Sequence, residues 1–320
     1  MRTLLPIIIL AMAIQGCDNE NLPTNMIIAH RGLPYYAPEE TLPAFLLARD
    51  LGADYLEADL QRTKDGVIIA LHDNTLQRTT NIKDVYPERA NEPVSNFTWH
   101  ELQELDAGSW FNAAYPEQAR DSYINLKIIT LEQLIDIAEA GTKSPGIYLE
   151  AKHPDQFPGI EADLKELLSK RGWYQQHFAD GRPKVILQTF SAKSLKLLHE
   201  NFPETPLCYL WWAGGGCLTQ VDSAHVNECL DYAVANGAQI IGPSFSGKQT
   251  QYTNLLEPWI TELIHTRGLQ IHAYTFDSQK DIDDFAPACD SQFTNRTDLL
   301  LDYYKRPHES VAHILQSLKY

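Results

Sequence analysis

Basic residues are scarce in this 320-residue sequence. It contains 26 lysines and arginines against 42 aspartates and glutamates, which gives a formal net charge of −16 at pH 7. Binding along a nucleic-acid backbone needs a broad basic surface, and this composition does not supply one. The composition therefore excludes a general nucleic-acid binder. If the protein handles phosphate, the positive charge must be local and must come from a few basic side chains or a metal ion.

Long hydrophobic runs are also absent, apart from one at the start of the chain. Arg2 precedes a nearly unbroken apolar run over 4–14, which small residues follow, as in an export signal. The segment Ala13-Ile14-Gln15-Gly16-Cys17 resembles a bacterial lipobox, in which Cys17 would be lipidated. We expect a signal peptide over 1–17 and a polar tether over 18–25. An ordinary cleaved signal with an incidental cysteine is the alternative.

A lipoprotein signal peptide predicts an exported protein of the bacterial periplasm or cell envelope, attached to a membrane through its N-terminal lipid only. Which membrane holds the lipid is left open, and no protein partner is evident from the sequence. The remaining cysteines, Cys208, Cys217, Cys229 and Cys289, form no CxxC pair, so a zinc site is not favoured. In an oxidising compartment they could form two disulfides, with three possible connectivities, or they could stay as buried thiols.

The rest of the chain alternates short β-branched runs with helix-like segments. Capping boxes open helices at Thr98 and Thr130, and 44% of the residues are hydrophobic, as in a folded globular protein. Strand–helix alternation at this spacing predicts a parallel sheet covered by helices. We expect strands over 26–30, 55–61, 67–72, 146–152, 184–189, 207–211, 239–242, 270–275 and 291–294.

Nine strands are one too many for an eight-stranded barrel. Only Lys64-Asp65-Gly66 separates the second strand from the third, and Asp-Gly between apolar runs indicates a hairpin. Without this antiparallel return strand, eight parallel strands remain, so we expect an α/β TIM (β/α)8 barrel over 26–320. Residues from about 74 to 127 break the alternation and predict a small insertion above the barrel mouth. A doubly wound sheet is the runner-up, but no Gly-rich dinucleotide loop follows the first strand.

Carboxylates gather where the strands are predicted to end. Residues two apart on a strand share a face, so Glu57 and Asp59 project together, as do Glu150 and Lys152. Three carboxylates in a barrel mouth make an oxygen-rich site that suits one divalent cation, Ca²⁺ or Mg²⁺. A solvated strand edge is the alternative. It explains two carboxylates more easily than three inside an apolar barrel.

Two histidines and two basic residues are predicted to reach the same place. His30 ends the first strand, and the hairpin brings His72 back beside Asp59. The histidines could ligate a metal, but the oxygen-rich site is complete without them, so we favour a general acid and base pair. Arg31 and Lys152 could clamp a phosphate diester. Taken singly, each of these side chains could serve only the structure.

Taken together, these residues resemble a known family, the glycerophosphodiester phosphodiesterases. The resemblance spans about 27–298, nearly the whole mature chain, and lies in the order and spacing of short motifs. These motifs are His30-Arg31-Gly32, Ala37-Pro38-Glu39-Glu40-Thr41, Glu57-Ala58-Asp59, Lys64-Asp65-Gly66, the run from His72 to Thr80, the run from Leu105 to Phe111, Thr130-Leu131-Glu132, Glu150-Ala151-Lys152, Gln188-Thr189-Phe190, Tyr274-Thr275 and Thr294-Asn295-Arg296.

The resemblance implies a TIM barrel with an insertion after the second histidine. It also implies roles by motif position: metal ligation by Glu57, Asp59 and Glu150, acid and base catalysis by His30 and His72, phosphate contact by Arg31 and Lys152, and a pocket lined by Tyr274. Two positions depart from the family pattern. Glu40 stands where asparagine is usual, and Tyr274 stands where tryptophan is common.

The implied reaction is metal-dependent hydrolysis of a small-molecule glycerophosphodiester to glycerol 3-phosphate and an alcohol. The nucleophile could be water or the glycerol hydroxyl of the substrate. One alternative function is that of a lysophospholipase D, which acts on a lipid that still bears one acyl chain. That chain could lie on the aromatic residues Tyr35, Tyr36, Trp110 and Phe111. The other alternative is a non-catalytic lipoprotein that only binds a phosphodiester or a partner.

Overall fold

The computed structural model describes residues 22–245 and 253–320, so the predicted signal peptide and Cys17 lie outside the described residues. Within these ranges one sheet has the order β1-β9-β8-β7-β6-β5-β4-β2-β3, and pairing of β1 with β2 closes eight parallel strands into a barrel. The predicted TIM barrel is confirmed. Its strands are β1 (Met26–Ala29), β2 (Tyr55–Arg62), β3 (Ile68–Ala70), β4 (Gly146–Ala151), β5 (Val185–Thr189), β6 (Leu207–Trp211), β7 (Ala238–Pro243), β8 (Gln270–Ala273) and β9 (Ser291–Thr294).

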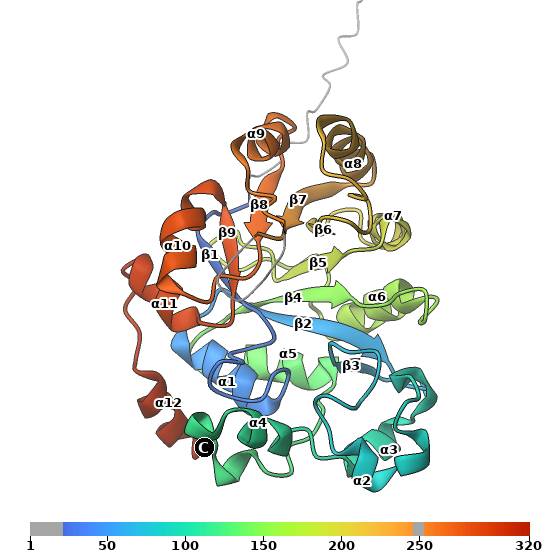
Figure 1. Ribbon diagram of the computed structural model, residues 1–320, viewed down its shortest axis with the longest axis vertical. Coiled ribbons are helices and arrows are strands. Elements are labelled where there is room, and N and C mark those ends of the chain that lie inside the picture. The colour runs from blue at the N-terminus through green and yellow to red at the C-terminus, as the bar shows by residue number, and fades with distance from the viewer. Residues whose placement is uncertain (1–21, 246–252) are drawn as a thin grey trace, which may run out of the picture.

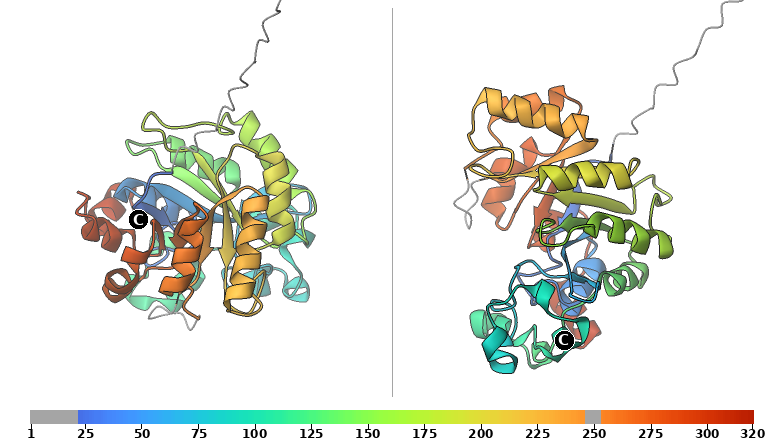
Figure 2. Two further views of the ribbon diagram at one scale, coloured as in Figure 1. Left: turned by 90° about the horizontal axis from the view of Figure 1, so that it is seen from above. Right: turned by 90° about the vertical axis from the view of Figure 1, so that its right-hand side faces the viewer.

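Helices surround this sheet on its outer side (Figures 1 and 2). The capping boxes predicted at Thr98 and Thr130 are both formed, at the starts of α3 and α5. The helices are α1 (Leu42–Leu51), α2 (Ile82–Val85), α3 (Trp99–Glu104), α4 (Ser109–Ala114), α5 (Leu131–Glu139), α6 (Ile160–Lys170), α7 (Ala192–Asn201), α8 (Ser223–Ala235), α9 (Pro258–Thr266), α10 (Gln279–Phe285), α11 (Thr297–Tyr303) and α12 (Val311–Leu318). None of the helices in the described ranges is long and apolar enough to cross a membrane.

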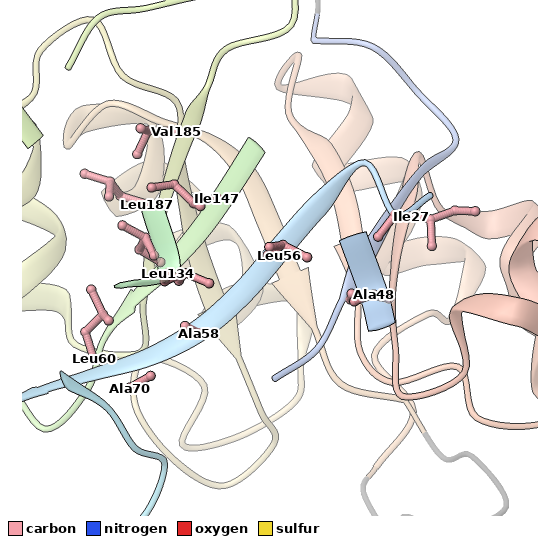
Figure 3. Close-up of a cluster of buried hydrophobic side chains, with 14 of the residues drawn as sticks. Ile27, Ala48, Leu56, Ala58, Leu60, Ala70, Leu134, Ile147, Val185 and Leu187 are labelled. Carbon is pink, nitrogen blue, oxygen red and sulfur yellow. The ribbon is translucent and has the colours of Figure 1, made fainter. Parts of the chain in front are cut away.

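Strand β2 shows how the barrel presents polar groups at its mouth. Leu56, Ala58 and Leu60 belong to the buried cluster between strands and helices, where Figure 3 draws them near Leu134 of α5. Burying one such leucine contributes about 2 kcal/mol. The residues between them point the other way, into the barrel. There a separate apolar cluster, which includes Tyr55 of the same strand, forms a floor.

The hairpin after β2 places the second histidine. β3 runs antiparallel to β2 with Leu60 opposite Ala70, and the amide of Leu71 donates to the carbonyl of Asp59 over 2.8 Å. β3 is shorter than the predicted 67–72, and past its end the carbonyl of Leu71 accepts a hydrogen bond from the Gln61 side chain. His72 therefore follows the strand and lies next to the β2 carboxylates.

Residues 74–127 lie outside the barrel, beside the β2–β3 hairpin, and contain α2, α3 and α4 (Figure 1). Their buried residues, among them Leu76, Phe97 and Leu102, form a small core with Ile69 of β3. The chain terminus after α12 packs on this region, and Arg120 donates to the carbonyl of Tyr320 over 3.2 Å. The insertion thus shares its small apolar core with β3, β4 and α6, and Phe111 and Tyr123 join it to the main core of the barrel.

The four late cysteines form one disulfide. Cys217, in the loop after β6, is bonded to Cys229 of α8. Cys208 is a free buried thiol, and Cys289 is a free, half-buried thiol. The sequence left open two disulfides or buried thiols, and the structure has one disulfide and two free thiols.

Candidate active site

All the site residues predicted in the described ranges line one cavity of about 430 Å³ at the carboxyl ends of the strands. TIM-barrel enzymes place their active sites at this end of the barrel. The cavity therefore brings together groups that stand up to 244 residues apart in the sequence. They are His30, Arg31, Glu57, Asp59, His72, Glu150, Lys152 and Tyr274.

Three buried carboxylates form its polar wall. Asp59 of β2 is in register with Glu150 of β4, and Glu57 lies one pleat below Asp59. One carboxylate oxygen from each residue lies within 4.8 Å of the others, a spacing that a single cation can bridge. Glu57 also accepts hydrogen bonds from Gln188 Nε2 over 2.9 Å and from the Arg31 amide over 2.8 Å. These bonds fix the direction in which the carboxylate points.

The crowding of negative charge changes how these groups titrate. Burial, together with the neighbouring Asp59, raises the pKa of Glu57 well above its ordinary value. Burial likewise raises the pKa of Glu150 to about 8, against the opposing effect of Lys152. Burial alone would also raise the pKa of Asp59, but Lys152 and Arg31 lower it well below its usual range. Burial thus disfavours the ionised form of Glu57 and Glu150, whereas the two cations favour the ionised form of Asp59.

Two cations share the wall with the carboxylates. Lys152 Nζ lies 3.2 Å from Asp59 Oδ1 and 3.1 Å from Glu150 Oε1. Arg31 Nε lies 3.0 Å from Asp59 Oδ2, and Arg31 Nη1 lies 3.1 Å from Glu39 Oε1. Both cations are mostly buried, so a phosphate that enters the cavity meets positive charge already held in place.

The donor set fits a hard divalent cation. All three groups offer carboxylate oxygen, the donor that Ca²⁺ and Mg²⁺ prefer. Asp59 Oδ2 lies beside the Arg31 guanidinium, at 3.0 Å from Nε, and the pair does not meet hydrogen-bond geometry, so this oxygen keeps capacity to ligate a cation. A bound cation would also offset the burial and the mutual repulsion that raise the pKa of Glu57 and Glu150.

The two histidines face the cavity with different partners. His72 Nδ1 lies 2.6 Å from Asp73 Oδ1, and Arg78 Nε donates to Asp73 Oδ2 over 2.7 Å. His30 Nδ1 lies 2.9 Å from Asn295 Oδ1. Burial, with a smaller effect from the Arg31 charge, lowers the pKa of His30 to about 3. His30 is therefore neutral near pH 7.

Several residues that support these groups were not predicted. Arg78 joins Asp73 to Glu39, and Glu39 holds Arg31, so an ion-pair chain links the two sides of the mouth. Asp73, Arg78 and Glu39 all lie within the motifs quoted above, but a motif does not indicate which of its members touch. Asn295 also lies in such a motif, whereas nothing in the sequence pointed to its contact with His30.

An apolar wall faces the carboxylates. Phe190, Leu210, Trp212, Tyr274 and Phe293 contribute to it, and the Tyr274 hydroxyl donates to the Trp211 carbonyl over 2.7 Å. Phe111 takes no part, because it is completely buried in the core. It therefore offers no surface for an acyl chain. Tyr35 and Trp110 line a neighbouring cavity of about 220 Å³ that shares His30 and Arg31.

A TIM barrel with a carboxylate, histidine and arginine site at its mouth is the framework of a barrel-type phosphodiesterase. The sequence matches the glycerophosphoryl diester phosphodiesterase family over residues 30–299, and the chain belongs to this family. It is 35% identical over 257 residues to a glycerophosphodiester phosphodiesterase of Bacillus subtilis, which covers 80% of this chain and 78% of that protein. The protein is an enzyme of this phosphodiesterase class.

Solved structures of relatives have the same fold. A glycerophosphodiester phosphodiesterase from Agrobacterium tumefaciens superposes with a TM-score of 0.62 at 24% identity, over 87% of this chain and 99% of that chain. A phosphodiesterase from Oleispira antarctica, solved with its product sn-glycerol 3-phosphate, gives a TM-score of 0.67 at 21% identity, over 88% of this chain and 97% of that chain. At these identities the superpositions establish the barrel.

Proposed function

We propose that the protein hydrolyses glycerophosphodiesters to glycerol 3-phosphate and a free alcohol, with one divalent cation, Ca²⁺ or Mg²⁺, at Glu57, Asp59 and Glu150. The observation that carries the proposal is the meeting of three carboxylates, two histidines and two basic side chains in one cavity. A bound cation would supply charge neutralisation at the phosphate oxygens. The product bound to the Oleispira relative supports the choice of substrate.

Each side chain of the site has a separate role in the proposed hydrolysis. Arg31 and Lys152 bind the phosphate and stabilise the charge that develops on its oxygens. His30 accepts the proton of the nucleophile, either water or the glycerol hydroxyl of the substrate, as the new P–O bond forms; in the second route a cyclic phosphate results, and water must then open it to give glycerol 3-phosphate. His72 gives a proton to the departing alcohol oxygen as the old P–O bond breaks, and the Asp73 carboxylate at its Nδ1 holds the ring in place. Tyr274 packs against the carbon skeleton of the substrate.

A substrate panel tests this function. Mature protein is incubated with glycerophosphocholine or lysophosphatidylcholine, and glycerol 3-phosphate and lysophosphatidate are measured. We expect glycerol 3-phosphate from the first substrate at the higher kcat/KM. A clear preference for lysophosphatidylcholine would instead support a lysophospholipase D, to which the apolar wall around Trp212 is suited. The His72→Asn variant, with the exposed His100→Asn variant as control, separates catalysis from mere binding, because only catalysis requires His72.

We further infer that the protein is exported and anchored through lipid on Cys17. The apolar run and the lipobox-like segment support this, and so does the Cys217–Cys229 disulfide, a bond that persists in oxidising compartments. Metabolic labelling with a radioactive fatty acid tests it. The wild-type chain should incorporate label and fractionate with membranes, whereas Cys17→Ser should do neither. Equal labelling of both chains would contradict the inference.

A further inference from the structure

The two histidines of the site are held in different ways. His72 contacts a carboxylate, that of Asp73. His30 contacts the neutral amide of Asn295, which follows β9. Asn295 in turn is held by Asp277, a residue of the loop after β8. Asn295 Nδ2 donates to Asp277 Oδ2 over 2.8 Å, and its backbone amide donates to Asp277 Oδ1 over 2.9 Å.

This chain of contacts determines where the His30 proton lies. An ionised carboxylate only accepts hydrogen bonds, so the NH₂ group of Asn295 must face Asp277. The amide oxygen then faces His30 Nδ1, and an oxygen without a proton can only accept. Nδ1 therefore carries the ring proton of neutral His30. Nε2 keeps its lone pair, and no hydrogen bond from the described residues occupies it.

Asp277 itself is a carboxylate whose hydrogen-bond donors are all neutral, and burial together with the charge of Asp281 raises its pKa. Thr275 Oγ1 gives it a third hydrogen bond over 3.2 Å, and no ion pair of the described residues includes it. A largely buried carboxylate without a cation costs stability. Its three hydrogen bonds offset part of that cost, and two of them fix Asn295 in one orientation.

We propose that Asp277 is a positioning residue that acts through Asn295 to hold His30 as the Nδ1–H tautomer, which leaves Nε2 as the proton acceptor. The proposal rests on the function proposed above. It adds a residue that is not part of the cavity holding the three carboxylates and that lines the neighbouring cavity with Asn295. Only the tautomer with a free Nε2 can take a proton from the nucleophile in the cavity.

Asp277→Asn provides a sharp test because it keeps the shape of the side chain and changes only its hydrogen-bonding polarity. With its oxygen on the Asn295 backbone amide, its NH₂ group meets the Asn295 side chain, which must turn over. The Asn295 NH₂ group then donates to His30 Nδ1, and the ring proton moves to Nε2. We expect kcat to fall by about 10²-fold or more while KM stays within about threefold.

The double variant Asp277→Asn/Asn295→Asp is the matched rescue. The new carboxylate accepts both from the amide at 277 and from His30 Nδ1–H, so the original tautomer returns. We expect it to recover at least tenfold of the lost kcat. If Asp277 and Asn295 served only the structure, the double variant should have a lower kcat than Asp277→Asn alone. Thermal unfolding of each variant verifies that the fold is intact.

Nitrogen NMR of the His30 ring reads the tautomer without any turnover. We expect a protonated Nδ1 in the wild type, a protonated Nε2 in Asp277→Asn and a protonated Nδ1 again in the double variant. A wild-type ring protonated on Nε2 would overturn the proposal even if every variant failed to fold. A folded Asp277→Asn with unchanged kcat, or no rescue, would also overturn it. A wild type that turns over no glycerophosphodiester would count against the proposed function, while the NMR result still tests the relay.

Discussion

Glu40 adopts a backbone conformation that is unusual for glutamate. Its φ is +55°, in the left-handed region, and its side chain is buried. Oε1 accepts the backbone amide of Asp59 over 2.7 Å, which ties the loop after β1 to the carboxylate strand β2. Asparagine, which is usual at this position in the family that the sequence resembles, tolerates this region more easily. The strain at Glu40 therefore persists because its side chain satisfies a buried donor.

Removing that acceptor should destabilise the protein more than removing the charge. We expect Glu40→Ala to lower the free energy of unfolding by about 1–3 kcal/mol, since it leaves the Asp59 amide without a partner. Glu40→Gln keeps the acceptor oxygen and removes a buried carboxylate whose pKa burial raises, so its stability should equal or exceed that of the wild type. Urea unfolding measures both variants. Equal stability of the two would contradict this role.

His272 gives the fold a predictable dependence on pH. It is completely buried, Nδ1 lies 3.2 Å from the Tyr148 hydroxyl, and Nε2 lies 3.1 Å from Gln270 Oε1. Burial lowers its pKa to about 3. Between that value and about 6.5, the unfolded chain binds a proton that the folded chain does not. This contribution to stability is therefore present above about pH 6.5 and is lost as the pH falls.

We expect the wild type to lose about 2 kcal/mol more stability than His272→Gln when the pH is lowered from 7 to 5. The other titrating groups, His30 among them, are common to both proteins and cancel in the comparison. Urea unfolding at the two pH values measures the difference. Parallel losses in the two proteins would show that His272 is not held neutral.

At the scale of elements, the loop after β6 shapes the apolar wall of the cavity. Trp212 is 41% exposed at the mouth, and its ring lies so close to Gly215 that a Cβ there would overlap it. The amide of Gly214 donates to the carbonyl of Leu218 over 2.8 Å, which closes the loop on itself. The disulfide from Cys217 to Cys229 then anchors the loop to α8. Backbone and disulfide together hold the tryptophan in one place.

Breaking the disulfide should loosen this loop. Cys217 and Cys229 are 12 residues apart, and a closed loop of that size contributes about 3 kcal/mol by restricting the unfolded chain. We expect the Cys217→Ser/Cys229→Ser variant to be less stable by about that amount. A reductant should lower the wild type to the same level and leave the double variant unchanged. If a reductant also destabilised the double variant, a group other than this disulfide would be responsible for the effect of the reductant on stability.

The glycine under Trp212 can be tested separately. Gly215→Ala must displace the ring, so we expect KM for glycerophosphocholine to rise several-fold while kcat stays within about twofold. In a Trp212→Ala background the same glycine change should have little further effect, because the side chain that it displaces is gone. Additive effects of the two changes would contradict the contact as the cause.

At the scale of the whole molecule, the barrel and the meeting of Glu57, Asp59 and His72 in one site could be predicted from the sequence. Period-two alternation in the β2 region places Glu57 and Asp59 on one face, and the Asp65-Gly66 turn predicts the return of His72. The partners of the histidines could not be predicted. The predicted barrel closure brings the ends of β1 and β9 together, but it does not indicate that His30 and Asn295, 265 residues apart, are the side chains that meet there.

In the proposed function, hydrolysis depends on a cation held by Glu57, Asp59 and Glu150. The most direct test is glycerol 3-phosphate release from glycerophosphocholine by EDTA-treated protein, before and after Ca²⁺ or Mg²⁺ is restored. We expect no release without metal, full recovery with one of the two ions, and no recovery in Glu57→Gln at the same concentration. Undiminished release after complete removal of metal would contradict it.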